Sequence, residues 1–192
     1  MFVLASQSPR RRELLSMLGL TFEIITADID ETMDPSLTVE EAVRQVCFRK
    51  AEAVGAKCPG KLIVSADTIV VVDGKVLGKP HSEDEAFSML ESLSGRSHTV
   101  MTAFCLYRDG EAETHVEKTE LRFKTLSKEE ILAYIATGSP MDKAGAYGIQ
   151  DGAAVFVESL QGDYYNVVGL PLCALVKCLR KQGVTVLGTV KP

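Results

Sequence analysis

The sequence predicts an α/β protein with a mixed β-sheet, whose paired lobes would leave a cleft between them. Strand-like and helix-like segments alternate in the first half of the chain, whereas longer stretches with the pattern of antiparallel hairpins follow in the second half. The chain has 192 residues, of which 46% are hydrophobic, so it can bury a substantial core. No long linker separates independent modules, and we therefore expect residues 1–192 to form a single domain.

The first half of the chain alternates apolar runs with helices whose caps are visible in the sequence. Ser8 can cap a helix at Pro9, because proline at the first helical position loses no hydrogen bond. Thr38 and Glu41 have the spacing of a capping box. The expected elements are a strand at 2–5, a helix from Pro9 to Gly19, a strand at 22–27, a helix from Thr38 to about Val54, and two β-branched runs within 61–75 on either side of Ser65-Ala66-Asp67.

Asp-Gly pairs and two further capping boxes mark the second half. An Asp-Gly pair favours the tight turn of a β-hairpin. Ser82 with Glu85 and Ser127 with Glu130 each have the capping-box spacing. The expected elements are a hairpin turn at Asp73-Gly74, a helix from Ser82 to near Gly95, strands within 98–126 that turn at Asp109-Gly110, a helix from Ser127 to Gly138, a hairpin at 153–168 that turns near Gln161-Gly162, and a helix from Leu172 to Lys181.

The composition narrows the classes of partner. The formal net charge of −5 argues against a nucleic-acid polymer as a partner, because such binding needs a broad basic face. The apolar runs are only a few residues long and no signal peptide is visible, so we expect no membrane span and a cytoplasmic protein. The five cysteines form no CxxC pair, which is typical of reduced thiols and not of a zinc site.

Three consecutive arginines follow a Ser-Gln-Ser-Pro turn in the stretch "LASQSPRRREL". A strand, a short turn and a helix N-terminus form a recurrent anion site, because free backbone N–H groups and the helix dipole point to one place. Ser6 and Ser8 add hydroxyl groups there. Arg10 and Arg11 oppose the dipole in the first turn, an unfavourable placement that a bound phosphate would offset. The alternative is a solvated arginine run, and we expect Arg12 to face solvent.

Asp67 interrupts an otherwise apolar pair of strands in the stretch "VSADTIVV". A carboxylate at such a place is costly unless it is paired, hydrogen-bonded or holding a metal, so we favour a functional role over an ordinary turn aspartate. Glu31 belongs to the acidic cluster "DIDET", which by itself is typical of a solvated loop. Lys79 lies in a loop framed by glycine and proline, a good place to fix a cation, although most loop lysines are surface residues.

The segment "DKAGAYGIQ" carries two glycines, an apolar context for Tyr147 and the amide of Gln150. Such a loop can approach a planar ligand closely, or it can be an ordinary irregular connection. The three histidines are scattered without the spacing of metal ligands, and we expect none of them to be catalytic.

Seven stretches of the chain form a specific pattern by their order, although each of them is weak alone. They are "LASQSPRRRELL", "DIDET", "FRKAEAV", "VSADTIVVVDGKVLGKP", "LSGRSHTVMTAFCL", "DKAGAYGIQ" and "GDYYNVVGLPL". In this order, and over nearly the whole chain from about residue 3 to residue 180, they resemble the Maf family of nucleoside triphosphate pyrophosphatases.

The resemblance implies the fold shared with inosine triphosphate pyrophosphatases, an elongated mixed sheet flanked by helices with a cleft between two lobes. It also implies hydrolysis of a nucleoside triphosphate to the monophosphate and pyrophosphate with a divalent metal. By position, Asp67 matches the catalytic carboxylate, and with Glu31 it would hold Mg²⁺ or Mn²⁺. The positions that the resemblance links to substrate binding are Ser6, Arg10, Arg11, Lys50, Thr68, Lys79 and Gln150.

The resemblance extends to the substrate. Arg10, Thr68 and Gln150 fall on positions linked to the choice of dTTP and UTP, and the "AYGIQ" loop is similar to that branch and unlike the branch acting on 7-methyl-GTP. Asp151 stands where family members usually carry glycine, a departure that can alter loop shape or selectivity. A water activated by Asp67 or by the metal would attack the α-phosphorus, and the sequence leaves both roles open.

Two other functions compete with this one. A nucleotide-binding regulator of cell division, which acts on septum formation through a protein partner, is the alternative, but a pure sensor would not need the carboxylate of Asp67. A house-cleaning enzyme for deaminated purines rests on the shared fold alone. The expected partners are a small-molecule nucleotide and, in a homodimer, a second copy of the chain.

Overall fold

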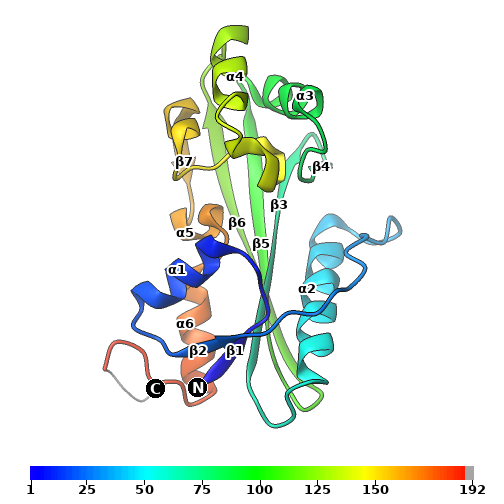
Figure 1. Cartoon of the computed structure of the whole chain (residues 1–192), viewed down its shortest axis with the longest axis vertical. Coiled ribbons are helices and arrows are strands. Elements are labelled where there is room, and N and C mark those ends of the chain that lie inside the picture. Colours follow the sequence, from blue (N-terminus) through cyan, green and yellow to red (C-terminus); the bar gives the residue numbers. More distant parts are fainter. Residues whose placement is uncertain (189–192) are drawn as a thin grey trace. The chain divides into compact units, whose positions relative to one another are not determined.

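The computed structural model describes residues 1–188 and contains a mixed β-sheet flanked by helices (Figure 1). Its strands are β1 (Phe2–Leu4), β2 (Phe22–Ile24), β3 (Ile63–Val72), β4 (Lys75–Leu77), β5 (Ser97–Arg108), β6 (Glu111–Phe123) and β7 (Val157–Gln161). Six of them are hydrogen-bonded in the order β2-β1-β3-β5-β6-β7, and β4 pairs with β3. β1 is parallel to β2 and β3, whereas β4 and β7 are antiparallel to their partners. The predicted α/β class and the mixed sheet are confirmed.

The helices connect and cover these strands. They are α1 (Pro9–Met17), α2 (Val39–Gly55), α3 (Glu83–Leu93), α4 (Lys128–Ile135), α5 (Tyr164–Val168) and α6 (Leu172–Lys181), with short 3₁₀ segments η1 (Ser139–Asp142), η2 (Ala144–Ala146) and η3 (Gly152–Phe156). Within residues 1–188, none of these helices is long and apolar enough to cross a membrane.

The residues group into two compact units. The first unit comprises Met1–Asp67, Thr102–Glu117 and the chain from Gly169 onward, and the second unit comprises Thr68–Met101 and Lys118–Val168. Strands β3, β5 and β6 contribute residues to both units. The single-domain organisation and the cleft between lobes stay predictions.

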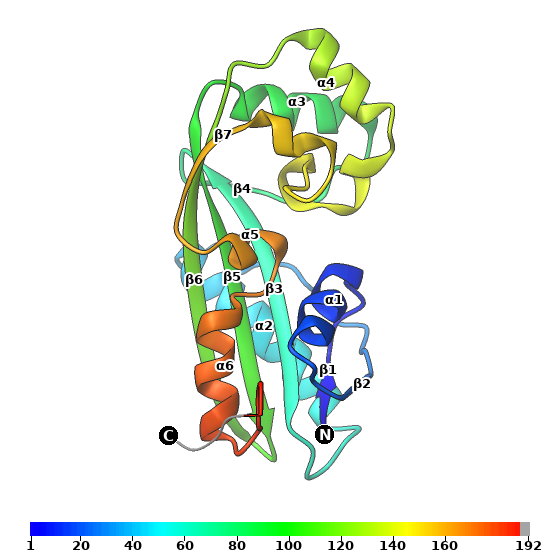
Figure 2. The ribbon, with the colours of Figure 1, turned by 90° about the vertical axis from the view of Figure 1, so that its left-hand side faces the viewer.

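In the first unit, helices cover both faces of the strands. α2 lies on one face, and α1 and α6 lie on the other (Figures 1 and 2). Leu15 of α1, Val43 and Val46 of α2, and Ile63 of β3 are fully buried in its core. Each of these side chains lies on the apolar face of its element, so burial of that face stabilises the helices against the strands.

The second unit has its own core beneath α3 and α4, which pack against each other (Figure 2). Leu90 and Leu93 of α3 and Ile131 of α4 are buried there with Phe123 of β6. Tyr147 belongs to the same cluster, although it comes from an irregular segment. The loop that follows Tyr147 therefore starts from a residue that is fixed in the core.

The predicted helix caps are present, with one difference. The side chains of Ser8, Thr38 and Ser127 accept hydrogen bonds from the first turns of their helices, and the capping boxes of Thr38 and Ser127 are closed by the third-position glutamates. The box at Ser82 is not closed, because the Glu85 carboxylate accepts from the N–H of His81 instead. The extended approach of the chain to α3 brings this earlier amide within reach.

Asp67 lies inside a strand and not in a turn, because the two predicted β-branched runs form the single strand β3. The turns that do occur are the two Asp-Gly pairs, at which Asp73 and Asp109 have φ of 49° and the glycines that follow them are also at positive φ. This left-handed pairing is the geometry of a type I′ hairpin turn, and it confirms both predicted turns.

The predicted hairpin at 153–168 is wrong. Only β7 is a strand, and it pairs with β6, while the segment after it forms α5. The side-chain amide of Asn166 is fully buried and donates to the Val100 carbonyl and to the Thr119 hydroxyl. A helical turn directs this amide inward, so the need to satisfy a buried polar group overrides the strand pattern of the tyrosines and valines.

All five cysteines are free thiols, four of them buried and Cys173 exposed. Burial raises the pKa of the Cys47 thiol, and it raises the pKa of Cys105 to about 12. These two thiols are therefore neutral and unsuited to nucleophilic attack.

Candidate active site

The turn between β1 and α1 arranges two serine hydroxyls around one arginine. The Ser8 N–H donates to Ser6 Oγ at 3.2 Å, and Ser8 Oγ accepts from the Arg11 backbone N–H at 3.5 Å. The Arg11 side chain turns back, so that its Nη1 donates to Ser6 Oγ at 3.1 Å. The serine-rich turn therefore positions the guanidinium as well as capping the helix.

Arg11 is the arginine that the fold buries. Its Nε donates to the Gly169 carbonyl at 2.8 Å, and only 9% of the residue is exposed. Burial lowers the pKa of this guanidinium, and the nearby negative charge of Asp67 opposes that shift. Arg10 is half-buried and Arg12 is exposed, as predicted for Arg12. The three arginines thus have three different environments within one helical turn.

Lys50, Glu31 and Asp67 form a compact charged cluster in the first unit. The Lys50 ammonium lies 2.6 Å from the Asp67 carboxylate and 3.0 Å from the Glu31 carboxylate. Lys50 comes from α2, Asp67 from β3 and Glu31 from the segment between β2 and α2. The side chains of Lys50 and Asp67 are 14% and 15% exposed, and that of Glu31 is 60% exposed. Pairing with Lys50 explains how a strand can hold the Asp67 carboxylate.

The second unit ties two of the predicted loops together. The Gly145 N–H donates to the Gly78 carbonyl at 2.9 Å, which joins the "GKP" loop to the loop that contains Gln150. Gly145 has φ +68°, and a Cβ there would lie 2.8 Å from a methyl group of Val70, so glycine fits for both reasons. Lys79 is exposed, and its ammonium makes no ion pair with any residue between 1 and 188.

Tyr147 is a core residue and not a group that faces a ligand. It is 5% exposed, its hydroxyl lies 2.7 Å from His98 Nε2, and its ring packs edge-on against Phe123. Burial lowers the pKa of His98 to about 4, so this histidine is neutral at physiological pH. His98 is therefore a buried structural partner of Tyr147.

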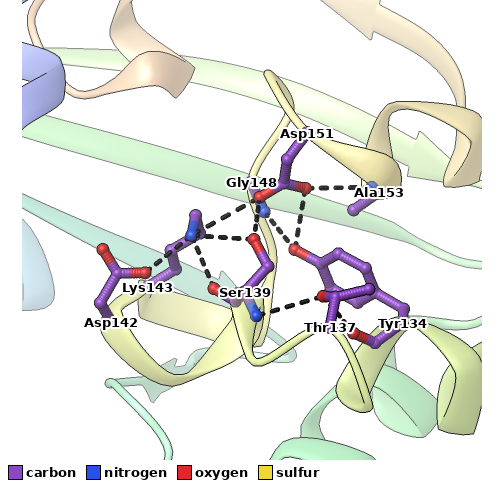
Figure 3. Close-up of polar contacts among 8 residues, drawn as sticks. All are labelled: Tyr134, Thr137, Ser139, Asp142, Lys143, Gly148, Asp151 and Ala153. Atoms are coloured by element: carbon purple, nitrogen blue, oxygen red, sulfur yellow. Dashed lines mark hydrogen bonds and ion pairs between the residues drawn. The ribbon is translucent and has the colours of Figure 1, made fainter.

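Gln150 lies at an exposed turn whose neighbours form a polar network that was not predicted (Figure 3). The Asp151 N–H donates to the Gly148 carbonyl at 3.2 Å and closes the turn. The network around it joins Tyr134, Ser139, Lys143, Gly148, Asp151 and Ala153. Of this network, the sequence pointed to Asp151 as a residue that can alter the shape of the loop.

The predicted residues therefore fall into two groups. The first unit brings together Ser6, Arg10, Arg11, Glu31, Lys50 and Asp67, and the second unit holds Thr68, Lys79 and Gln150. Thr68 directly follows Asp67 on β3. In the part of the chain that the structure describes, no three His, Cys, Asp or Glu side chains form a cluster that could hold a metal by themselves.

A cavity of about 400 Å³ in the first unit lies away from these residues. Phe2, Leu20, Leu62 and Arg108 contribute to its wall, and none of the predicted site residues does. We assign no part of the reaction to it, because the Lys50–Glu31–Asp67 cluster and Arg11 do not line it.

The chain is similar to known proteins over nearly its whole length. The model of the family described as Maf-like protein matches residues 1–182. The dTTP/UTP pyrophosphatase of Geobacillus sp. (strain WCH70) is 47% identical, over 94% of this chain and 97% of that protein. The dTTP/UTP pyrophosphatase of Symbiobacterium thermophilum is 50% identical, over 94% of this chain and 93% of that protein.

Among solved structures, the fold is similar to that of the Staphylococcus aureus Ham1 protein. The TM-score is 0.55 at 13% identity, over 94% of this chain and 98% of that one, which supports the fold alone. The family match and the two relatives cover nearly the whole chain, including every stretch that carries the predicted site. The chain belongs to the Maf family.

Proposed function

We propose that this protein hydrolyses nucleoside triphosphates, dTTP and UTP foremost, to the monophosphate and pyrophosphate. The observation that carries the proposal is the Lys50–Glu31–Asp67 cluster in the same unit as the buried Arg11. Relatives that are 50% identical in sequence to this chain are named dTTP/UTP pyrophosphatase, and this supports both the reaction and the substrates.

Charge neutralisation is the first task of such a site, since a triphosphate carries about four negative charges at neutral pH. Arg11 is fixed by Ser6 and by the Gly169 carbonyl, so its guanidinium needs little rearrangement on binding. Arg10 beside it, Lys50 and Lys79 supply further positive charge. A preorganised cation lowers the barrier more than a mobile one, because its ordering precedes the reaction.

A divalent cation fits the acidic part of the cluster. Glu31 and Asp67 reach the same ammonium, so two carboxylates converge on one small volume. Mg²⁺ is commonly bound by one or two carboxylates and completed by substrate phosphates and water, and Mn²⁺ accepts similar oxygen ligands. We propose that Glu31 and Asp67 hold this cation, which would offset charge on the phosphates when bound.

Asp67 has a second role available to it. Its carboxylate can accept the proton of the water that attacks the α-phosphorus, and Lys50 would then hold the carboxylate in position. pH–rate profiles of Glu31 and Asp67 variants, measured over a range of metal concentrations, separate a base from a ligand. Loss of the acidic limb would identify the base, whereas rescue by added metal would identify a ligand.

The side-chain amide of Gln150 has the hydrogen-bonding groups needed to recognise a pyrimidine base. Uracil and thymine present an acceptor at O4 beside a donor at N3, and one primary amide offers the complementary pair. The side chain is exposed on its turn and can meet a ligand. We propose that this amide favours dTTP and UTP over purine nucleotides.

The proposal also covers the cellular compartment and the oligomeric state of the protein. Five free cysteines suit the cytoplasm, where thiols stay reduced. We propose a homodimer as the assembly, and sedimentation equilibrium at several protein concentrations tests it.

The experiment that tests the function is a panel of nucleotides assayed for pyrophosphate release with Mg²⁺ or Mn²⁺. We expect dTTP and UTP to lead by a wide margin over ATP and GTP. A panel led by GTP or 7-methyl-GTP would remove the pyrimidine assignment but leave the hydrolysis. Nucleotide binding without release of pyrophosphate would instead favour the regulator of septum formation.

A further inference from the structure

We infer that Asp151 and Tyr134 clamp the turn that carries Gln150, and that Asp151 is thereby a positioning residue for base selectivity. The inference rests on the proposed function, because it concerns how the same site recognises its base. It assigns a task to Asp151, whose carboxylate lies inside the network around this turn.

The turn to be clamped runs from Gly148 to Asp151. Its ends are joined by the hydrogen bond from the Asp151 N–H to the Gly148 carbonyl, and Ile149 and Gln150 occupy its tip. Gln150 is exposed, and its side chain makes no hydrogen bond within residues 1–188. The position of its amide therefore depends on the backbone of the turn and not on partners of its own.

One hydroxyl holds both ends of this turn. Tyr134 Oη accepts from the Gly148 N–H at 3.1 Å and donates to Asp151 Oδ1 at 2.9 Å (Figure 3). The tyrosine comes from α4, and its ring packs edge-on against Phe156 at a centroid distance of 5.4 Å. A group anchored in the core thus fixes the start and the end of the turn at once.

The Asp151 carboxylate is satisfied from three further directions. Its Oδ1 accepts from the Ala153 N–H at 3.0 Å, and its Oδ2 accepts from the Ser139 hydroxyl at 2.5 Å and lies 3.5 Å from the Lys143 ammonium. Burial disfavours the charged form, but these bonds outweigh it and lower the pKa of Asp151. The carboxylate is therefore an ionised structural group, turned toward its own loop (Figure 3).

Gly148 shows how closely the clamp approaches the backbone. A Cβ at this position would lie 2.6 Å from Asp151 Oδ2 and 2.6 Å from Cε of Lys143. Any larger residue would push the carboxylate and the lysine away from the turn. Gly148, Tyr134 and Asp151 therefore form one tightly packed cluster.

Selectivity between UTP and GTP is the property that such a clamp would control. Guanine presents an acceptor at O6 beside a donor at N1, the same pattern as O4 and N3 of uracil, but on a larger base. The position of the amide, and not its orientation, therefore distinguishes these two bases, and a turn fixed at both ends narrows the positions from which the amide can reach the base. The clamp then raises the cost of binding the larger base without touching the substrate.

The test measures kcat and KM for UTP and GTP in Tyr134→Phe, which removes one hydroxyl and keeps the ring. We expect the ratio of kcat/KM for UTP over GTP to fall about tenfold, chiefly through the KM for UTP. Asp151→Asn should lower the same ratio. The double variant should lose little more than either single variant, because both substitutions disrupt the same hydrogen-bond network. The matched controls are Tyr107→Phe and Asp84→Asn, which should leave the ratio unchanged.

A second measurement follows the turn itself. The Gly148 amide should exchange its hydrogen faster in Tyr134→Phe than in the wild type, while amides of α3 keep their rates. If Asp151→Asn does not fold, Tyr134→Phe and this exchange rate decide the question alone.

The outcomes separate the clamp from the proposed function. A wild type inactive on every nucleoside triphosphate would contradict the proposed function. An active wild type whose UTP:GTP ratio is the same in Tyr134→Phe would overturn the clamp alone. A uniform loss of kcat on both nucleotides, with an unchanged ratio, would mean that the network only stabilises the fold, and it too would overturn the inference.

Discussion

The two units hold their proposed substrate-binding groups by different physical means. In the first unit the charged side chains contact one another directly, as Lys50 does with Glu31 and Asp67. In the second unit the side chain of Gln150 makes no hydrogen bond to residues 1–188, and its neighbours fix the backbone instead. A substitution in the first unit therefore acts on the substituted group, whereas one in the second unit can act through a residue that never meets the substrate.

The largest effect should come from the carboxylate of the first unit. Asp67→Asn removes the negative charge needed for base or metal duty, and we expect turnover to fall about a thousandfold or more. The side chain keeps its size, so the melting temperature should move by only a few degrees. Pyrophosphate release and thermal unfolding test both parts, with Asp84→Asn as control. Turnover close to that of the wild type would exclude the proposed mechanism.

The next effect concerns the second unit and should change selectivity more than rate. Gln150→Glu removes the amide donor and adds a negative charge, so kcat/KM for dTTP and UTP should fall about tenfold or more. The carboxylate would relatively favour a cationic base such as 7-methylguanine. The nucleotide panel measures this change, and Gln161→Glu on exposed β7 is the control. An unaltered order of substrates would show that Gln150 does not read the base.

The two units also differ in how far sequence reasoning could reach. Arg11 and Asp67 were predicted from their charges and their places in the sequence, whereas Glu31 and Lys50 were predicted only through the resemblance to the family. What the sequence did not contain is their pairing: Lys50 is 17 residues from Asp67, and the carbonyl that holds Arg11 is 158 residues away. Such contacts arise only when the strands assemble.

The second unit shows more clearly which contacts local sequence patterns cannot predict. Tyr134 lies in a helix whose capping box was predicted correctly, yet nothing local marks its hydroxyl as the partner of a turn 14 residues away. The strand pattern at 153–168 was misleading for a related reason, since the buried amide of Asn166 and its partners Val100 and Thr119 are far apart in the chain. Local patterns predicted elements well, and polar groups satisfied over long distances decided the exceptions.

A smaller effect should distinguish the arginines of the first unit. Arg10→Ala should weaken substrate handling about tenfold, because it removes a half-buried cation beside the fixed Arg11. Arg12→Ala should change kcat/KM less than twofold, since Arg12 is exposed and lies about 200° around the helix from Arg10. Steady-state kinetics with UTP compare the two variants. Equal losses would mean that the cluster acts only as a diffuse positive field.

The smallest effect at neutral pH concerns His98. Acid should destabilise the second unit, which contains His98, before it destabilises the first unit. Its pKa is lowered by burial to about 4 in the folded protein, from an ordinary value near 6.5, so it is neutral when folded at pH 7. The unfolded chain binds the proton more readily, so stability is fully present above about pH 6.5 and falls as the pH drops toward 4. The loss of stability from this one group should reach roughly 3 kcal/mol near pH 4.

Tyr147, the partner of His98, anchors the loop that leads to Gln150, so the second unit should open first as the pH falls. Hydrogen exchange at pH 5 should show earlier opening around Tyr147 than around Lys50. His98→Gln should lower the melting temperature at pH 7 and flatten its dependence on acid, whereas an equally steep pH dependence in that variant would assign the acid sensitivity to other groups.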